Sequence, residues 1–253
     1  MTVVTVSSTS APDPVQRRTA YARSLMGIYG ATMLALGAAF GPYVEAGALL
    51  ILSFAFVSGW PIALGLTNTH AARVTLGLVV FAALGAATFG TLTTTTFVAV
   101  LAIFGVFLTE MFRRDGRAQL IEHISATLAG AMIVVSGSLW IHAAELERGP
   151  DVIIVSAITL AVVALMHAFE TSAARVVGFI NGIFFGAGTA FIVQINLATG
   201  LIIGLSVGLL YTVSARAVEA PEPAGKKHLG TTRAMFPLLA LGIIGYLLAA
   251  YLV

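Results

Sequence analysis

Long apolar stretches alternate with short polar ones along almost the whole chain. A helix needs about twenty apolar residues to cross roughly 30 Å of hydrocarbon, and stretches of this length recur from residue 24 onward. The pattern therefore predicts an all-α, polytopic transmembrane helical bundle of about nine spans. The predicted spans are residues 24–41, 43–66, 72–90, 93–112, 121–144, 151–169, 174–196, 198–215 and 234–252.

Polar segments divide the chain into four parts. Residues 1–22 are rich in Ser and Thr and contain two prolines, which predicts a disordered cytoplasmic tail. Residues 23–215 would form an eight-span bundle, residues 216–233 a cytoplasmic loop, and residues 234–253 the ninth span. The loop carries Lys226 and Lys227, and we interpret it either as a docking segment for another membrane protein or as a linker attracted to anionic lipid.

The basic residues give a prediction of orientation that does not depend on hydropathy. Short loops on the cytoplasmic side of a membrane retain Lys and Arg. When the predicted loops are numbered alternately, twelve of the thirteen basic residues fall on one side and only Arg148 falls on the other. We therefore predict a cytoplasmic N-terminus and an outer C-terminus. Trp60 and Trp140 lie near predicted span ends, where an aromatic belt is expected.

Composition excludes several classes of protein. With 58% apolar and 9% charged residues, the chain lies far outside the soluble range, so its main partner is a lipid bilayer. The basic residues are scattered rather than gathered on one face, which argues against nucleic acid. The absence of Cys excludes disulfides and thiolate metal sites. Arg outnumbers Lys, and Ala, Gly, Val and Thr are abundant, which is typical of high-GC, actinobacterial-type coding and suggests a bacterial plasma membrane.

Glycines recur every four residues in the seventh and eighth predicted spans. Small residues at this spacing let two helix backbones approach closely in lipid. The pattern indicates tight packing between these two spans, contact with another membrane protein, or a glycine-lined permeation path. The glycines concerned are Gly178, Gly182, Gly186, Gly200, Gly204 and Gly208.

Ionisable residues gather at the predicted cytoplasmic ends of the fourth to seventh spans. Glu110 and Arg114 lie four residues apart, and His167 and Glu170 lie three apart, so each pair could meet on one helix face. They form either a pocket for an anionic head group or a set of interfacial anchors, and whether a metal binds is unknown. The candidate residues are Glu110, Arg113, Arg114, Arg117, Glu122, His123, His167 and Glu170.

Within the predicted spans the polar inventory is small. Asn181 is the candidate intramembrane polar site, although an interhelical hydrogen bond would explain it equally well. No ionisable residue lies at mid-depth by the predicted boundaries, which weakens a proton-coupled carrier as an interpretation. The short motifs of phosphate-binding loops, zinc peptidases and esterases do not occur, and we predict no cofactor.

Residues 97–170 resemble the middle of phosphatidate cytidylyltransferases. The likeness rests on a span ending in Phe112-Arg-Arg-Asp-Gly-Arg117, followed by Ile121-Glu-His-Ile-Ser-Ala-Thr and another span. The resemblance implies a polytopic helical fold with a cytoplasm-facing site that transfers CMP to phosphatidic acid with a divalent metal. The acidic C-terminal signature of that family is missing, because no Asp follows Asp151, so no catalytic residue is carried over.

These observations predict a non-enzymatic transporter or accessory factor for an envelope lipid or a small solute. Two alternatives stay open at this point. One is a membrane-embedded phospholipid-type transferase with a cytoplasm-facing site, and the other is a structural subunit of a larger membrane complex.

Overall fold

The structure is a computed structural model that describes residues 14–113, 119–169, 171–217 and 228–253. All regular structure in this part of the chain is helical, which confirms the predicted all-α class. The helices are α1 (Pro14–Phe40), α2 (Pro42–Ala63), α3 (Thr69–Phe89), α4 (Leu92–Met111), α5 (Leu120–Ala144), α6 (Gly149–Met166), η1 (His167–Phe169), α7 (Ser172–Val193), α8 (Leu197–Ala217), α9 (His228–Ala240) and α10 (Gly242–Tyr251).

Seven apolar helical segments among the described residues are long enough to cross a membrane. They are α2, α3, α4, α5, α6 with η1, most of α7, and a segment at Gly230–Tyr251 that joins most of α9 to α10. The apolar part of α8, Leu197–Val213, is shorter, and α1 packs beside α2 and α6. By helix length and hydropathy the chain is a multi-pass membrane protein.

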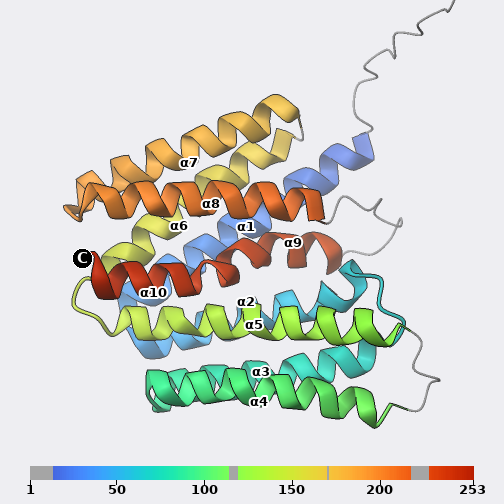
Figure 1. Ribbon diagram of the computed structural model, residues 1–253. Coiled ribbons are helices and arrows are strands. Elements are labelled where there is room, and N and C mark those ends of the chain that lie inside the picture. Colours follow the sequence, from blue (N-terminus) through green and yellow to red (C-terminus); the bar gives the residue numbers. More distant parts are fainter. Residues whose placement is uncertain (1–13, 114–118, 170, 218–227) are drawn as a thin grey trace, which may run out of the picture.

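The helices lie side by side in one bundle (Figure 1). The pair α7 and α8 forms one side, α3 and α4 form the other, and α1, α2, α5 and the α9–α10 segment fill the space between them. The N-terminal end of α1 and the C-terminus lie at opposite ends of the bundle. We call the end at which α1 begins the basic end, because arginines from five separate parts of the chain lie there, namely Arg23, Arg73, Arg113, Arg175 and Arg233.

Helix ends differ from the predicted boundaries of two segments. Helix α1 begins at Pro14, inside the predicted tail 1–22, of which residues 1–13 lie outside the described part. Proline is well tolerated at the first helical position, and the Gln and Arg that follow are good helix formers, so polarity there did not mean disorder. Helix α8 extends to Ala217 and α9 begins at His228, so both enter the predicted loop 216–233, whose residues 218–227 are outside the described part.

The two tryptophans are core residues, and their predicted place in an aromatic belt was wrong. Trp60 is 8% exposed and donates its Nε1–H to the Ala126 carbonyl oxygen at 2.8 Å. Trp140 is fully buried and donates to the Leu238 carbonyl oxygen at 3.0 Å. A buried indole N–H needs an acceptor, and each ring finds one on a neighbouring helix backbone.

The glycines of α7 and α8 face each other, which confirms tight packing between these two helices. A Cβ built on Gly182 would lie 3.0 Å from the Gly204 carbonyl oxygen, and one on Gly204 would overlap the Gly182 carbonyl. Gly186 and Gly200 have the same reciprocal relation. Because the backbones are in contact at these positions, these four glycines are not available to line a path or to pack against another protein.

The last apolar segment is interrupted midway, between α9 and α10. The Ser136 hydroxyl on α5 donates to the Ala240 carbonyl oxygen at 3.0 Å and accepts from the Ile243 N–H at 3.0 Å. Leu241 is the residue between the two helices. The Trp140 Nε1–H, also from α5, donates to the Leu238 carbonyl oxygen just before it. Helix α5 thus satisfies backbone groups around the interruption, which a hydrocarbon environment would leave without partners.

Candidate functional site

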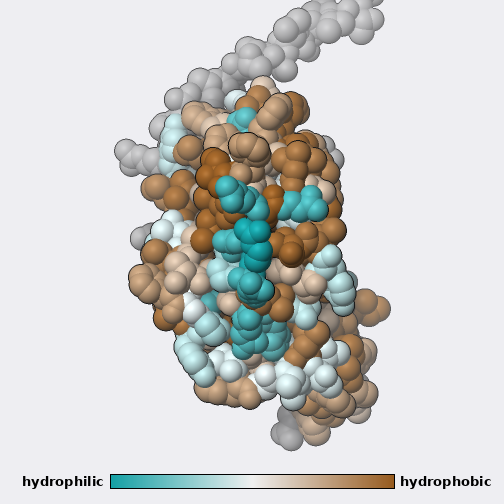
Figure 2. Space-filling view, turned by 90° about the vertical axis from the view of Figure 1, so that its left-hand side faces the viewer, coloured by the Kyte–Doolittle hydropathy of each residue, from teal (hydrophilic) through white to brown (hydrophobic). Residues whose placement is uncertain are grey.

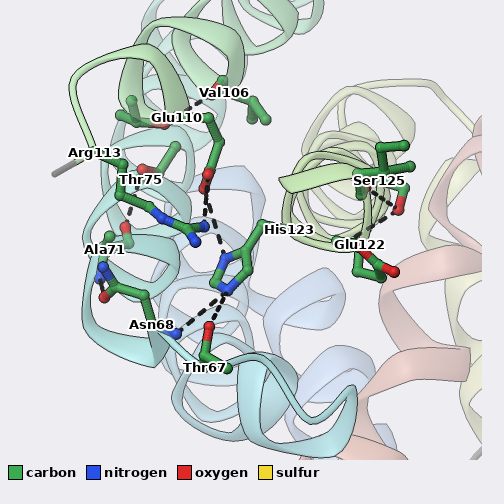
Figure 3. A network of polar contacts seen from close by, with 12 residues as sticks. Thr67, Asn68, Ala71, Thr75, Val106, Glu110, Arg113, Glu122, His123 and Ser125 are labelled. Carbon is green, nitrogen blue, oxygen red and sulfur yellow. Dashed lines mark hydrogen bonds and ion pairs between the residues drawn. The ribbon is translucent and has the colours of Figure 1, made fainter. Parts of the chain in front are cut away.

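Three of the predicted site residues meet at the basic end of the bundle (Figure 3). Glu110 lies in the last turn of α4, Arg113 follows that helix, and His123 lies in the first turn of α5. Arg113 Nη1 donates to Glu110 Oε2 at 2.7 Å, and His123 Nδ1 lies 3.6 Å from Glu110 Oε1. All three side chains are buried, with 3% of Arg113, 6% of Glu110 and none of His123 exposed.

The link between α2 and α3 holds the other side of the imidazole. The Asn68 backbone N–H donates to His123 Nε2 at 3.3 Å, and the Thr67 hydroxyl lies 3.1 Å from the same nitrogen. A backbone N–H can only donate, so Nε2 accepts and the proton of the neutral ring is on Nδ1, toward Glu110. The Asn68 side chain also caps α3 by accepting from the Ala71 N–H at 3.1 Å.

This arrangement joins α3, α4 and α5 through a self-neutralising ion pair. The Glu110 carboxylate compensates the Arg113 charge, so a phosphate head group would have to displace Glu110 in order to bind that guanidinium. Within the described part of the chain, no group of three or more His, Asp and Glu is placed to hold a metal ion. The geometry therefore suits a buried network that positions three helix ends.

The remaining predicted residues do not join this network where the structure describes them. Glu122 is exposed and points away from His123, as Figure 3 shows. His167 lies in η1, where Nδ1 is 2.9 Å from the Val163 carbonyl oxygen. Asn181 is half-buried on α7, on the far side of the bundle from α4 (Figure 1). Three predicted positions lie outside the described residues: Arg114, Arg117 and Glu170.

His167 is part of a second, separate contact near the basic end. Its ring centroid lies 5.2 Å from that of Tyr211 on α8, and Tyr211 is itself 6% exposed. Nearby, the Ser24 hydroxyl on α1 donates to the Ala164 carbonyl oxygen at 2.7 Å. These contacts join α1, α6 and α8, so His167 lies apart from the contacts of Glu110, Arg113 and His123.

Glu45 is the ionisable residue that sequence reasoning missed. It lies in the first turn of α2, at the end of the bundle opposite the basic end, and is completely buried. Its side chain packs against Gly37 of α1, and no described residue supplies a hydrogen bond to either carboxyl oxygen. In the sequence, Glu45 is the third residue of the predicted span 43–66, close to its outer end, and lies four residues after Gly41. Gly37 lies four residues before Gly41.

Figure 2 looks at the end of the bundle opposite the basic end and shows a hydrophilic stripe across it. Arg148, the exceptional arginine, lies between α5 and α6 and pairs with Asp151, with Nε 3.1 Å from Oδ2. The same guanidinium donates to the carbonyl oxygens of Gln194 at 2.9 Å and Val193 at 3.1 Å. Arg148 therefore links the α5–α6 turn to the C-terminal end of α7. At the same end of the bundle, His142 Nε2 lies 3.0 Å from the Thr95 hydroxyl of α4.

Comparison with protein families, curated proteins and solved structures finds no significant match to this chain. The resemblance of residues 97–170 to phosphatidate cytidylyltransferases therefore stays a prediction, and the function has to be argued from the geometry of the chain itself.

Proposed function

We propose that the chain crosses a bacterial plasma membrane nine times, with the basic end in the cytoplasm and the C-terminus outside. The support is the distribution of charge over the folded bundle. Described arginines from five separate parts of the chain gather at one end, whereas Arg148 at the other end is neutralised by Asp151 and bound to two carbonyl oxygens. Retention of basic residues on the cytoplasmic side explains this distribution.

We infer that the protein is a non-enzymatic transporter, or an accessory factor for transport, that handles a small solute or an envelope lipid. The interruption of the last span carries this inference. Interrupted helices inside a membrane are tolerated where protein groups satisfy the freed backbone, and they form the substrate and ion sites of many transporters. Here Ser136 and Trp140 supply those groups. The Glu110–Arg113 pair is buried and neutralised internally, so these two side chains are not presented to a substrate.

The test is depletion of the protein in the organism that encodes it, followed by profiling of envelope lipids and small solutes. We expect one class of lipid or solute to be redistributed and the wild-type gene to restore it. Ser136→Ala should restore it poorly because two backbone groups at the interruption lose their partner. Ser138→Ala is the matched control, since its hydroxyl donates only to Val135 of the same helix, at 2.7 Å.

Two outcomes would overturn this function. One is turnover of a phosphorylated lipid by the purified protein with a divalent metal, lost in His123→Ala, which would establish an enzyme. The other is an unchanged lipid and solute profile together with migration in a larger complex on native gels after mild extraction, which would establish a structural subunit.

A further inference from the structure

Glu45 is held inside a hairpin of unusual tightness. Only Gly41 separates α1 from α2, and its φ of +105° and ψ of 172° belong to a region that glycine alone adopts readily. The Gly41 N–H donates to the Gly37 carbonyl oxygen at 3.0 Å and closes α1, and the Gly41 carbonyl accepts from the Glu45 N–H at 3.0 Å and opens α2. The hairpin thereby places the Glu45 carboxyl directly against Gly37.

The surroundings of this carboxyl do not compensate a negative charge. An ionised carboxylate in a buried, apolar place is strongly disfavoured unless a cation or several donors accompany it. No described residue donates to either oxygen, and Gly37 offers only its Cα surface. Buried neighbours on α1 and α2 include Leu34, Ala38 and Leu49, which are all apolar. The carboxyl is therefore in its neutral, protonated form in this packing.

Titratable groups on the elements packed against α2 do not change this conclusion. Helices α1, α3, α5 and α9 pack against α2. Toward the Glu45 end, α5 contributes His142, whose ring faces the Thr95 hydroxyl and lies 3.4 Å from a Glu145 carboxyl oxygen. Away from the basic end, the other titratable side chains described on α1 and α2 are Tyr29 and Tyr43, which are 49% and 72% exposed. On α10, Tyr246 packs against His142 with ring centroids 6.4 Å apart, and at the α5–α6 turn Arg148 pairs with Asp151. The described part of α3 contributes none at this end, and the arginine of α9 lies at the basic end.

A proton fits this site better than a metal ion does. A bound Ca²⁺ or Mg²⁺ takes six or more oxygen ligands, whereas Glu45 belongs to no group of His, Asp and Glu among the described residues that could hold a metal. A proton needs only the carboxyl itself. An ionisable residue buried within a membrane bundle is also what proton-coupled carriers require.

We propose that Glu45 is a proton-binding site, occupied while α1 and α2 pack as they do here, and that loss of the proton separates the two helices at Gly37. Deprotonation places a charge where no partner exists, so the ionised side chain must move toward water at the nearby end of the bundle. Gly41 is the point about which α1 and α2 would part. The site does not depend on the transport function, although it would couple transport to a proton gradient.

Labelling with dicyclohexylcarbodiimide tests the protonation state directly. A carboxylic acid adds across one C=N bond of this apolar reagent, its proton going to nitrogen and its oxygen to carbon, and the adduct rearranges to a stable acylurea. The full-length protein in nanodiscs is labelled over a pH series and the modified peptides are identified by mass spectrometry. We expect labelling of Glu45 that falls as the pH rises and is lost in Glu45→Gln. Glu110 is the internal control, because it is almost as buried but ion-paired and should stay unlabelled.

Infrared spectroscopy covers the case in which the reagent does not reach the site. The carbonyl band of a protonated carboxyl should be present in the wild type and lost in Glu45→Gln, a nearly isosteric change whose folding is checked by thermal unfolding. An unlabelled Glu45 together with an unchanged band would show that the residue is ionised and would overturn the site. Labelling that does not change with pH would overturn release of the proton.

Separation of the helices is tested with a single introduced thiol, since the chain has no Cys. Ala38, next to Gly37, is 4% exposed. The maleimide reactivity of Ala38→Cys should rise with pH more steeply than that of the double variant Ala38→Cys with Glu45→Gln. In the double variant the thiol still titrates, but the introduced side-chain amide does not. Equal pH profiles would overturn the opening. None of these three measurements uses transport, so their results are independent of the proposed function.

Discussion

Replacing Ser136 by alanine tests whether α5 holds the interruption between α9 and α10. The change removes the donor to the Ala240 carbonyl oxygen and the acceptor for the Ile243 N–H, both at 3.0 Å. Part of this region is exposed, but exposure at this depth of the bundle is to hydrocarbon, so water does not replace the hydroxyl. Both backbone groups are then left without the partner they have in the native structure.

The expected loss of stability follows from these two groups. An unsatisfied buried polar group costs about 1–3 kcal/mol, whereas interhelical hydrogen bonds measured in a membrane protein average about 0.6 kcal/mol and reach about 1.7 kcal/mol. Since one hydroxyl serves two partners, we expect Ser136→Ala to lower the free energy of unfolding by about 1–3 kcal/mol. Ser138→Ala removes only a bond within α5 and should change it by about 0.5 kcal/mol or less.

Reversible unfolding by SDS titration in mixed micelles measures this difference. The fluorescence of the two buried tryptophans and the circular dichroism of the helices report on it together. Ser136→Ala should unfold at a lower SDS fraction than the wild type, with Ser138→Ala close to the wild type. If the two variants unfold at the same SDS fraction, Ser136 does not hold the interruption and our account of that segment is refuted.

The same titration checks three further changes. Gly204→Ala should destabilise the protein by about 1–3 kcal/mol or more because its Cβ meets the opposing backbone, whereas Gly188→Ala, with nothing within 4 Å, should be neutral or stabilising by up to about 1 kcal/mol. Glu110→Gln removes the carboxylate that pairs with the buried Arg113 guanidinium and should cost about 3–5 kcal/mol, against about 0.5 kcal/mol or less for the exposed Glu122→Gln; equal effects would contradict the ion pair. Trp140→Phe removes one donor and part of the buried ring volume, for an expected loss of at least about 1–3 kcal/mol that a wild-type midpoint would disprove.

The helices were predictable because a membrane helix leaves a signal in single-residue hydropathy and in loop charge. Length decides that signal, so nearly every predicted span overlaps a helix of the structure. The ends of α1 and α9 were not predictable in the same way. At Pro14 and at His228 the helix continues into polar sequence, and there helix propensity and packing decide the boundary rather than hydropathy. The Thr232 hydroxyl, for example, donates to the Phe56 carbonyl oxygen at 3.0 Å.

The site was predictable only as far as local spacing reaches. Clustering of ionisable residues at span ends pointed to Glu110, Arg113 and His123. Spacing alone did not decide whether Glu110 pairs with the arginine three residues later or with the one four residues later. The structure pairs it with Arg113, three residues later. How deeply a side chain beside a tight turn is buried depends on how the two helices pack. Glu45 therefore looked like an acidic residue at the outer end of the second predicted span, and its burial became apparent only once α1 was packed against α2. Trp60 was misplaced for the same reason, since an interfacial and an inward-facing indole have the same sequence signal.

The single-residue link at Gly41 also constrains how the chain is inserted during synthesis. Consecutive Cα atoms are about 3.8 Å apart, so one residue leaves α1 and α2 no slack to enter the bilayer at different times. In the proposed topology the two helices are translocated as one hairpin, with the basic segment before α1 retained at the cytoplasmic surface. The tip that crosses carries Glu45, and its neutral form crosses hydrocarbon far more readily than its ionised form. In this topology the first hairpin is complete once residue 63, the end of α2, has left the ribosome, so its orientation is set before the later helices are made.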